Sequence, residues 1–300
     1  MFDLKAYADL LGDHIEEAHK MANVIESAGF PARAARMRNC CTYTKGVYCP
    51  TCHTFHTTAG SLCRDRLCPN CGWNLSRKRA VAVAEAVDMV SRHMEIVPLH
   101  IMLTVQHNEQ SDLSDSINNL LQAFHSLIGR QCIKKHMLGY VRNVEITKGD
   151  AGFHPHLHVL MVFDGDYYKD MITQAQLAET WQKCLNVDYT PIVWIKAAYA
   201  KEGKDTLQAA VYECVKYTIK SAEWLRLGPD ELKTLMQAVY CRRFFSVGGA
   251  LYLPYRCALK EAQEAIADDP ATRCSKCGSK RRVAVFNSKG GVVDVKFEQE

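Results

Sequence analysis

The stretch FHPHLHVLMVF, residues 153–163, decides the fold. Side chains in a β-strand point alternately to opposite faces, so His154, His156 and His158 share one face, while Leu157 and Val159 lie on the other. The apolar residues that follow the histidines predict a buried core strand. Neutral imidazoles this close together can bind one divalent ion. The alternative is three solvated histidines on an exposed sheet face.

The preceding stretch supplies a partner strand. MLGYVRNVEITKG, residues 137–149, has the composition of a strand, and the turn GDAG connects it to the histidine strand. Two strands joined by a short turn pair antiparallel, so Glu145 should be a cross-strand neighbour of the histidines. Two imidazoles and one carboxylate leave open positions on a bound ion, as in catalytic metal sites. Glu145 could instead be a surface carboxylate.

Strands and helices alternate around this pair. Apolar patterns predict at least four strands and three helices within residues 98–222, including strands over 99–106 and 190–198. The fold class is therefore α+β, with an antiparallel central sheet flanked by helices. We expect an N-terminal helical segment (1–38), a zinc-binding module (39–75), a main domain (76–256) and a C-terminal tail (257–300). The tail is charged and lacks periodicity.

Composition limits the classes of protein. The chain has 300 residues, of which 48% are hydrophobic, yet no stretch reaches the about 18 to 20 consecutive apolar residues of a membrane helix. The acidic N-terminal stretch excludes a secretory signal. These features predict a cytoplasmic protein without membrane partners.

Charge is concentrated in one segment. Residues 31–80 hold nine Lys or Arg and one Asp, a net charge of +8, whereas the whole chain has +4. Such a block is typical of a surface that binds nucleic acid. An ordinary solvated face is the alternative. We expect contacts to DNA phosphates from five residues near the cysteine-rich segment: Arg64, Arg66, Arg77, Lys78 and Arg79.

Cysteines are abundant in the same segment. Of the fourteen cysteines, seven lie between residues 40 and 71. The spacing Cys49-x2-Cys52, then fifteen residues, then Cys68-x2-Cys71 predicts one structural zinc site with four thiolates. Cys40, Cys41, His53, His56 and Cys63 lie nearby, so the complete ligand set and the number of ions stay open. Cys274 and Cys277 form a further pair that could join Cys257 or cysteines near the N-terminus.

A second group of polar residues lies in YECVKYTIK, residues 212–220. On a helix Glu213, Tyr217 and Lys220 share one face. A tyrosine nucleophile would benefit from a lysine that stabilises negative charge and from a carboxylate that orients or deprotonates water. Taken alone, these residues also fit a half-buried tyrosine beside a solvated ion pair.

Together these motifs resemble the HUH endonucleases, and among them the initiators of rolling-circle plasmid replication. The resemblance rests on five stretches in the family's order, and it extends from about Cys63 to Tyr252. They are CRDRLCPNCGWNLSRKRA, IMLTVQHNEQSDLSDSINNLLQAFHSLIGR, GYVRNVEITKGDAGFHPHLHVLMVF, ECVKYTIK and RRFFSVGGALY.

The resemblance implies an HUH nuclease domain with a ferredoxin-like or RRM-like sheet. It implies that His156, His158 and Glu145 hold Mg²⁺ or Mn²⁺. We expect His154 to contact these ligands rather than the ion itself. It implies that Tyr217 nicks one strand of an origin, forming a 5′-phosphotyrosyl link and a 3′-OH primer, with Lys220 assisting and Glu213 activating water at termination. The implied partners are origin DNA, single-stranded or supercoiled, and a host helicase and polymerase.

Alternatives differ in their chemistry. A transposase or relaxase of the same superfamily would use the same nicking reaction. The histidines also fit a histidine-triad nucleotide hydrolase, which needs no metal. A non-enzymatic, zinc-dependent nucleic-acid binder would have no use for the tyrosine helix. Tyr212 raises a two-tyrosine mechanism, but it projects from another helix face than Tyr217. The N-terminal helix and the C-terminal cysteine pair do not map onto the family pattern.

Overall fold

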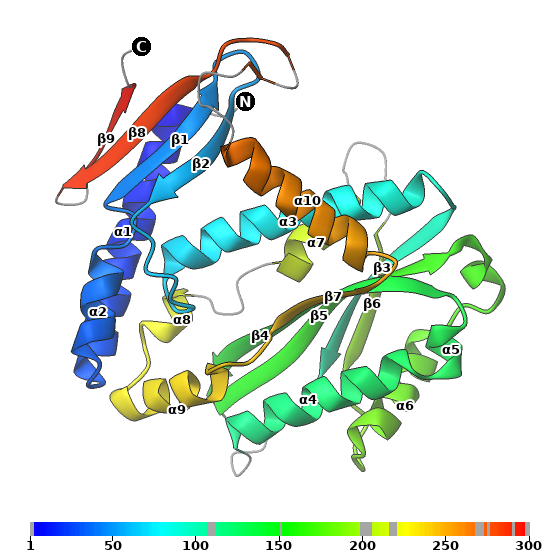
Figure 1. Cartoon of the computed structure of the whole chain (residues 1–300). Coiled ribbons are helices and arrows are strands. Elements are labelled where there is room, and N and C mark those ends of the chain that lie inside the picture. Colours follow the sequence, from blue (N-terminus) through cyan, green and yellow to red (C-terminus); the bar gives the residue numbers. More distant parts are fainter. Residues whose placement is uncertain are drawn as a thin grey trace. The chain divides into compact units, whose positions relative to one another are not determined.

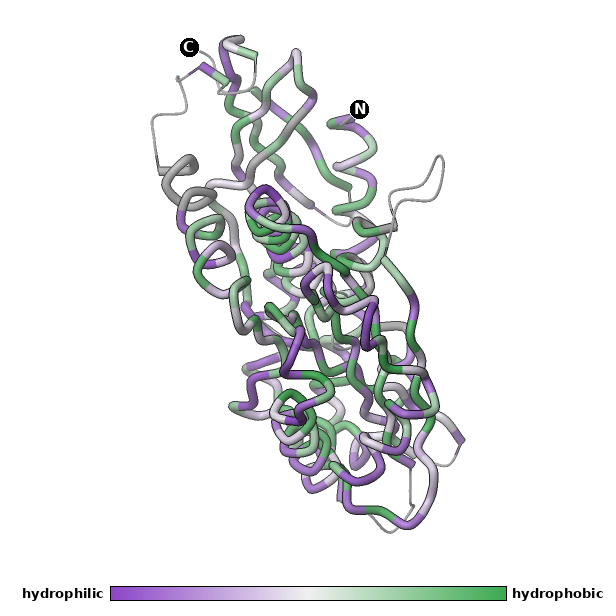
Figure 2. The backbone as a smooth tube through the Cα atoms, turned by 90° about the vertical axis from the view of Figure 1, so that its right-hand side faces the viewer, coloured by the Kyte–Doolittle hydropathy of each residue, from purple (hydrophilic) through white to green (hydrophobic). Residues whose placement is uncertain are grey.

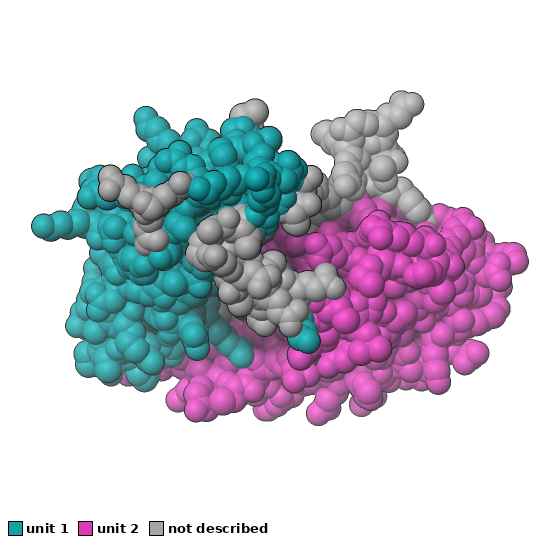
Figure 3. All heavy atoms as spheres, turned by 45° about the horizontal axis from the view of Figure 1, so that its top comes forward, with its two compact units in different colours: residues 1–75, 224–232, 260–300 teal, residues 76–223, 233–259 magenta. Residues whose placement is uncertain are grey.

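The chain forms two compact units, which are coloured separately in Figure 3. Unit 1 contains residues 1–75, 224–232 and 260–300, and unit 2 contains residues 76–223 and 233–259. A computed structural model describes residues 3–106, 112–150, 152–198, 206–215, 221–267, 273–274, 277–289 and 292–297.

Unit 2 is built on a five-stranded antiparallel sheet with the strand order β6-β3-β5-β4-β7 (Figure 1). This confirms the predicted α+β class. The predicted hairpin is present, and its strands β4 and β5 are the two longest strands of the sheet. The strands are β3 (Ile96–Thr104), β4 (Met137–Gly149), β5 (Gly152–Asp164), β6 (Val193–Ala197) and β7 (Phe245–Gly249).

The central strand β5 is buried from Leu157 to Phe163 because helices cover both faces of the sheet. One face carries the histidines and then Leu160 and Val162, which pack against the helices α3, α7 and α10. The opposite face packs against α4 and α6. The helices are α3 (Pro69–Ser91), α4 (Leu113–Ile128), α6 (Gln174–Leu185), α7 (Thr206–Val215) and α10 (Tyr252–Ala267).

The sequences of these helices explain their positions. Helix α4 buries Ile117, Leu120 and Phe124 on one stripe, and Asp112 caps its first turn. Figure 2 shows hydrophobic and hydrophilic residues alternating within the turns of the helices, as expected for amphipathic helices. Helix α6 begins with a capping box formed by Thr173 and Gln176. Short helical segments complete this part: α5 (Gln131–Lys134) and the 3-10 helix η1 (Gly165–Lys169).

Unit 1 contains a four-stranded antiparallel sheet with the order β2-β1-β8-β9, so its strands come from both ends of the chain. Tyr7 and Phe286 from opposite ends meet Phe55 in an aromatic core, with ring centroids 5.1 to 5.2 Å apart. The elements are α1 (Leu4–Ser27), α2 (Pro31–Arg38), β1 (Tyr43–Cys49), β2 (Thr54–Gly60), β8 (Arg282–Lys289) and β9 (Val292–Phe297).

The C-terminal residues 257–300, which we expected to form a tail, contain regular structure. Residues after 256 continue helix α10 and then form β8 and β9, and β8 pairs with β1 over Tyr43 to Tyr48. The predicted N-terminal helix is confirmed as α1. Two further helices, α8 (Ser221–Trp224) and α9 (Pro229–Val239), contribute residues to both units.

Within the described ranges, every helix is either too short or too polar to cross a membrane.

Candidate metal centres

The hairpin of β4 and β5 brings together the predicted carboxylate and two of the histidines. Glu145 is the direct cross-strand partner of His156. Its Oε2 lies 3.3 Å from Nε2 of His156 and 2.7 Å from Nε2 of His158. The ligand atoms of all three residues lie within 4.8 Å of one another, so they could hold one metal ion. We call these three residues the Glu-His-His group.

The other nitrogen of each imidazole is already engaged. Nδ1 of His156 lies 3.2 Å from the backbone oxygen of His154, which can only accept a hydrogen bond. Nδ1 of His158 lies 3.3 Å from Nε2 of His100. If both rings carry their proton on Nδ1, Nε2 of each ring has a lone pair that could bind a metal ion. His154 therefore acts on the group through its backbone, and its side chain is not among the three possible ligands.

His100 is a residue that the sequence analysis missed. It lies on β3, is only 6% exposed, and its ring stacks on that of His158 at an interplanar angle of 10°. A lone histidine in the apolar strand LHIMLT was the available signal. Strand pairing explains its position, because β3 is the neighbour of β5 and His100 faces the same side of the sheet as His158.

The donors of the Glu-His-His group fit a divalent cation. Glu145 is 4% exposed and His158 8% exposed, and burying a carboxylate is unfavourable unless positive charge or hydrogen bonds compensate it. A cation bound by the carboxylate and two neutral imidazoles would supply that compensation. Mixed oxygen and nitrogen ligands suit several divalent metals.

Helix α7 covers the sheet face that carries the Glu-His-His group. Ala210, Val211 and Cys214 of this helix are buried against the same cluster as Leu160 of β5. The helix is described as far as Val215, and Glu213 lies on it, although only its backbone is described. Tyr217 and Lys220 lie outside the described residues.

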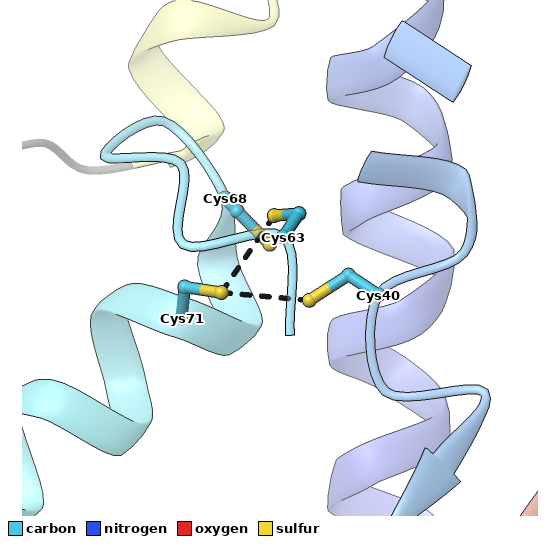
Figure 4. Close-up of side chains that lie close together, drawn as sticks. All are labelled: Cys40, Cys63, Cys68 and Cys71. Atoms are coloured by element: carbon cyan, nitrogen blue, oxygen red, sulfur yellow. Dashed lines mark hydrogen bonds between the residues drawn. The ribbon is translucent and has the colours of Figure 1, made fainter. Parts of the chain in front are cut away.

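The cysteines that were assigned to a single site do not come together. Instead, two clusters of four form, each with one of the predicted pairs. The first contains Cys40, which follows α2, and Cys63, Cys68 and Cys71 around the start of α3 (Figure 4). The second contains Cys49 and Cys52 from the turn between β1 and β2, with Cys274 and Cys277. The spacing of fifteen residues misled the assignment because each pair has another partner pair in space.

The sulfur separations in both clusters match tetrahedral coordination. A Zn–S bond of about 2.3 Å places the sulfurs of a tetrahedral site about 3.8 Å apart. In the first cluster Sγ of Cys71 lies 3.5 Å from Cys40 and 3.6 Å from Cys63. In the second cluster the distances are 3.5 Å between Cys49 and Cys277 and 3.9 Å between Cys52 and Cys274. All fourteen cysteines lie among the described residues, and none of them forms a disulfide there.

Hydrogen bonds prepare the first cluster for a cation. The pKa of the Cys71 thiol is lowered because Cys40, Cys63 and Cys68 donate hydrogen bonds to its sulfur. The pKa of Cys40 is raised to about 12, chiefly by its contact with Cys41. Cys71 is therefore the favoured thiolate, and metal binding would release protons from the other three thiols.

The predicted DNA-binding arginines and lysine differ in their surroundings. Arg64 and Arg66 are exposed on the loop before α3, and Arg77 and Lys78 are exposed on α3. Arg79 is half-buried, and its guanidinium lies 4.2 Å from the ring centroid of Phe245. Arg79 thus packs within unit 2, whereas the other four have exposed side chains that could reach phosphates.

Comparison with known proteins identifies the family. The model of the Rep_1 family, described as Replication protein, matches residues 54–277. The chain belongs to the Rep_1 family of replication proteins. This match includes the Glu-His-His group and Tyr217, and it confirms the resemblance seen in the sequence motifs.

Three proteins that are similar to this chain are each named Protein rep. The relative from Lactiplantibacillus plantarum is 35% identical over 202 residues, which are 63% of this chain and 64% of that protein. The one from Streptococcus pneumoniae is 30% identical over 62% of this chain and 60% of that protein. The one from Bacillus amyloliquefaciens is 28% identical, over 82% and 78%. The chain thus spans less than two thirds of the first two relatives. No solved structure matches it.

Proposed function

We propose that this chain initiates rolling-circle replication of a plasmid by nicking one DNA strand at an origin. The observation that carries the proposal is the convergence of Glu145, His156 and His158 on the sheet face beneath α7, the helix that leads toward Tyr217. Membership of a replication protein family supports the same reaction and speaks against a histidine-triad nucleotide hydrolase. A transposase or relaxase with this chemistry would differ in biological context.

In this proposal the Glu-His-His group holds Mg²⁺ or Mn²⁺. A divalent ion at this position would polarise the scissile phosphate and offset the negative charge that develops on it. The chain fixes the ligands by holding both Nδ1 atoms, through His154 and His100. These two contacts keep the rings turned toward Glu145, which reduces the reorganisation that binding requires.

Tyr217 is the proposed nucleophile. Its phenolic oxygen attacks phosphorus, the bond from phosphorus to the 3′-oxygen breaks, and the 3′-oxygen leaves as a hydroxyl while the 5′-phosphate stays on tyrosine. Lys220, three residues further along the chain, would stabilise the charge on the phenolate or phosphate. Glu213 would activate the water that hydrolyses the link at termination. A host polymerase would extend the 3′-OH, and a helicase would separate the strands.

The two cysteine clusters are proposed to bind structural zinc. Four thiolates at tetrahedral spacing leave no open position for substrate, which is typical of structural sites. Metal analysis of the purified protein should therefore find two zinc ions per chain. The exposed residues Arg64, Arg66, Arg77 and Lys78 are the proposed phosphate contacts, and they would position DNA without reading its sequence.

The decisive experiment is detection of the covalent intermediate. The protein is incubated with Mn²⁺ and labelled single-stranded fragments of its own replicon, and adducts are separated by denaturing electrophoresis. The wild-type chain and Tyr212→Phe should form the adduct, and Tyr217→Phe should not, because only Tyr217 is the proposed nucleophile. An adduct that persists in Tyr217→Phe would refute the assignment. Activity that survives EDTA would contradict the metal-dependent reaction.

A second variant separates nicking from release. Glu213→Ala should form the adduct at the wild-type rate but release it slowly, because the carboxylate is needed only to activate water. The measurement is a time course of adduct formation and decay on one oligonucleotide. Equal loss of both steps would contradict the proposed role of Glu213.

A further inference from the structure

A pocket of about 500 Å³ adjoins the Glu-His-His group within unit 2. Its lining includes His100 and Met102 of β3, His158 of β5, Trp194 and Lys196 of β6, and Ala210 of α7. The strand register explains this arrangement, because Met102 pairs with both His158 and Trp194, while His100 pairs with Lys196. All these strand residues therefore face the side of the sheet that carries the Glu-His-His group.

The lining combines an aromatic ring, a cation and small apolar side chains. Trp194 is 41% exposed, which is high for the largest apolar side chain, and it contacts His100 edge to face at 84°. Nζ of Lys196 lies 5.9 Å from the Trp194 ring centroid. The alanines Ala197, Ala198, Ala209 and Ala210 complete the wall. Among the residues that the structure describes, the lining of the pocket contains no carboxylate side chain.

This chemistry fits one nucleotide. An exposed tryptophan provides a face on which any base can stack, and a neighbouring lysine can pair with the phosphate. The volume lies in the range of pockets that enclose small ligands. His158 belongs to both the pocket and the Glu-His-His group, so an occupant lies one imidazole away from the proposed ion.

We infer that this pocket binds an unstacked base of single-stranded DNA next to the scissile phosphate, with the base on Trp194 and its phosphate near Lys196. The inference rests on the proposed nicking function and adds a positioning site to it. A base in a pocket cannot be stacked in a duplex, so the strand must be single-stranded or locally melted at this nucleotide before it is cut. Trp194 then sets the register of the strand over the Glu-His-His group.

The test measures binding without cleavage. Single-stranded 20-nucleotide fragments that tile the replicon are labelled with a fluorophore, and their affinity for the full chain is measured by anisotropy in EDTA. For the tightest fragment, Trp194→Ala should weaken binding by about 5- to 150-fold, the range for losing one base stack. Trp194→Phe should recover most of the affinity. Tyr240→Ala, which removes a 76% exposed aromatic side chain outside the pocket, should bind like wild type.

A double-mutant cycle identifies the base. Each nucleotide of that fragment is replaced in turn by an abasic site, and at one position the loss should be large for wild type but small for Trp194→Ala, because both changes remove the same stack. Ala209→Leu enlarges an exposed residue in the wall of the pocket. It should weaken binding of the intact fragment but not of the fragment that carries the abasic site at that position. Thermal unfolding monitored by circular dichroism checks that the variants are folded.

The outcomes separate the two proposals. The pocket assignment would be overturned if the losses of affinity from the abasic site and from Trp194→Ala were additive at every position. It would also be overturned if a folded Trp194→Ala variant bound with wild-type affinity. In either case, adduct formation by the wild-type chain would still support nicking. If the wild-type chain forms no adduct with any fragment, the nicking proposal fails whether or not Trp194 affects binding.

Discussion

At the scale of single residues, the Glu-His-His group depends on a side chain that is not itself a ligand of the proposed ion. His158 is held between Glu145 at Nε2 and His100 at Nδ1. In a metal-bound form His158 must donate its Nδ1 proton to His100, so His100 carries its own proton on Nδ1. His100 is thus a positioning residue that selects the tautomer of a ligand.

Replacing His100 tests this role. His100→Phe keeps an aromatic ring beside His158 but removes the acceptor for its Nδ1 proton, so the affinity for Mn²⁺ should fall by about 10- to 100-fold. Isothermal titration calorimetry with Mn²⁺ provides the measurement. His93→Phe replaces an exposed histidine after α3 and should leave the affinity unchanged. Wild-type affinity in His100→Phe would show that the ring stack alone orients His158.

The residues of this site that lie on two strands joined by a short turn could be predicted from the sequence. Those on strands that are distant along the chain could not. Glu145 and His156 were predictable because a short turn fixes the register of β4 and β5. His100 and Trp194 reach the same face only through the order of strands in the sheet, which periodicity does not define. A lone histidine and a lone tryptophan in separate strands carry no spacing signal.

At the scale of elements, the end of β7 shows a backbone requirement. Gly249 has φ of +66°, and a Cβ there would lie 2.3 Å from the backbone oxygen of Leu138 on the neighbouring chain segment. Gly249 pairs with Gly139 of β4 in the sheet register. The close approach of two glycines lets the chain turn from the edge strand into α10.

Gly249→Ala should therefore destabilise unit 2. The left-handed backbone conformation is unfavourable by about 1 to 2 kcal/mol for alanine, and the clash with Leu138 adds to this. We expect a loss of at least about 2 kcal/mol in the free energy of unfolding, measured by urea denaturation. Gly29→Ala shares the positive φ but meets no atom within 4 Å, so it should lose only about 1 kcal/mol. Equal losses would show that the Leu138 contact relaxes.

Elements with long apolar patterns were predictable, whereas the sheet of unit 1 was not. Helix α1 buries eight residues at helical spacing, so its period is visible in the sequence. Strand β8 buries only Ala284 and Phe286 on one face, and turn-forming residues and cysteines surround β1 and β2. Short strands that pair over a long sequence separation leave little local pattern.

At the scale of the whole molecule, the second cysteine cluster ties the two ends of unit 1 together. Cys49 and Cys52 belong to the first hairpin of the chain, whereas Cys274 and Cys277 precede β8. The pairing of β1 with β8 places the same two segments side by side. A metal at this cluster would therefore stabilise the sheet by closing a long loop.

Cys274→Ser distinguishes two clusters from the single site that spacing predicted. If each cluster holds one ion, the zinc content measured by mass spectrometry of the native protein should fall from two to one, and the thermal stability of the protein should decrease. Cys132→Ser, which changes an exposed cysteine outside both clusters, should keep both ions. An unchanged zinc content in Cys274→Ser would mean that Cys274 is not a ligand.

The separation of the two halves of this cluster has a consequence during synthesis on the ribosome. Cys52 and Cys274 are 222 residues apart, which corresponds to roughly 10 to 45 seconds of translation at about 5 to 20 residues per second. Throughout that interval the first hairpin has emerged without the strand and the thiols that complete it. Maturation of the N-terminal hairpin thus waits for nearly the entire polypeptide, which would delay assembly of unit 1 until the sheet of unit 2 has been translated.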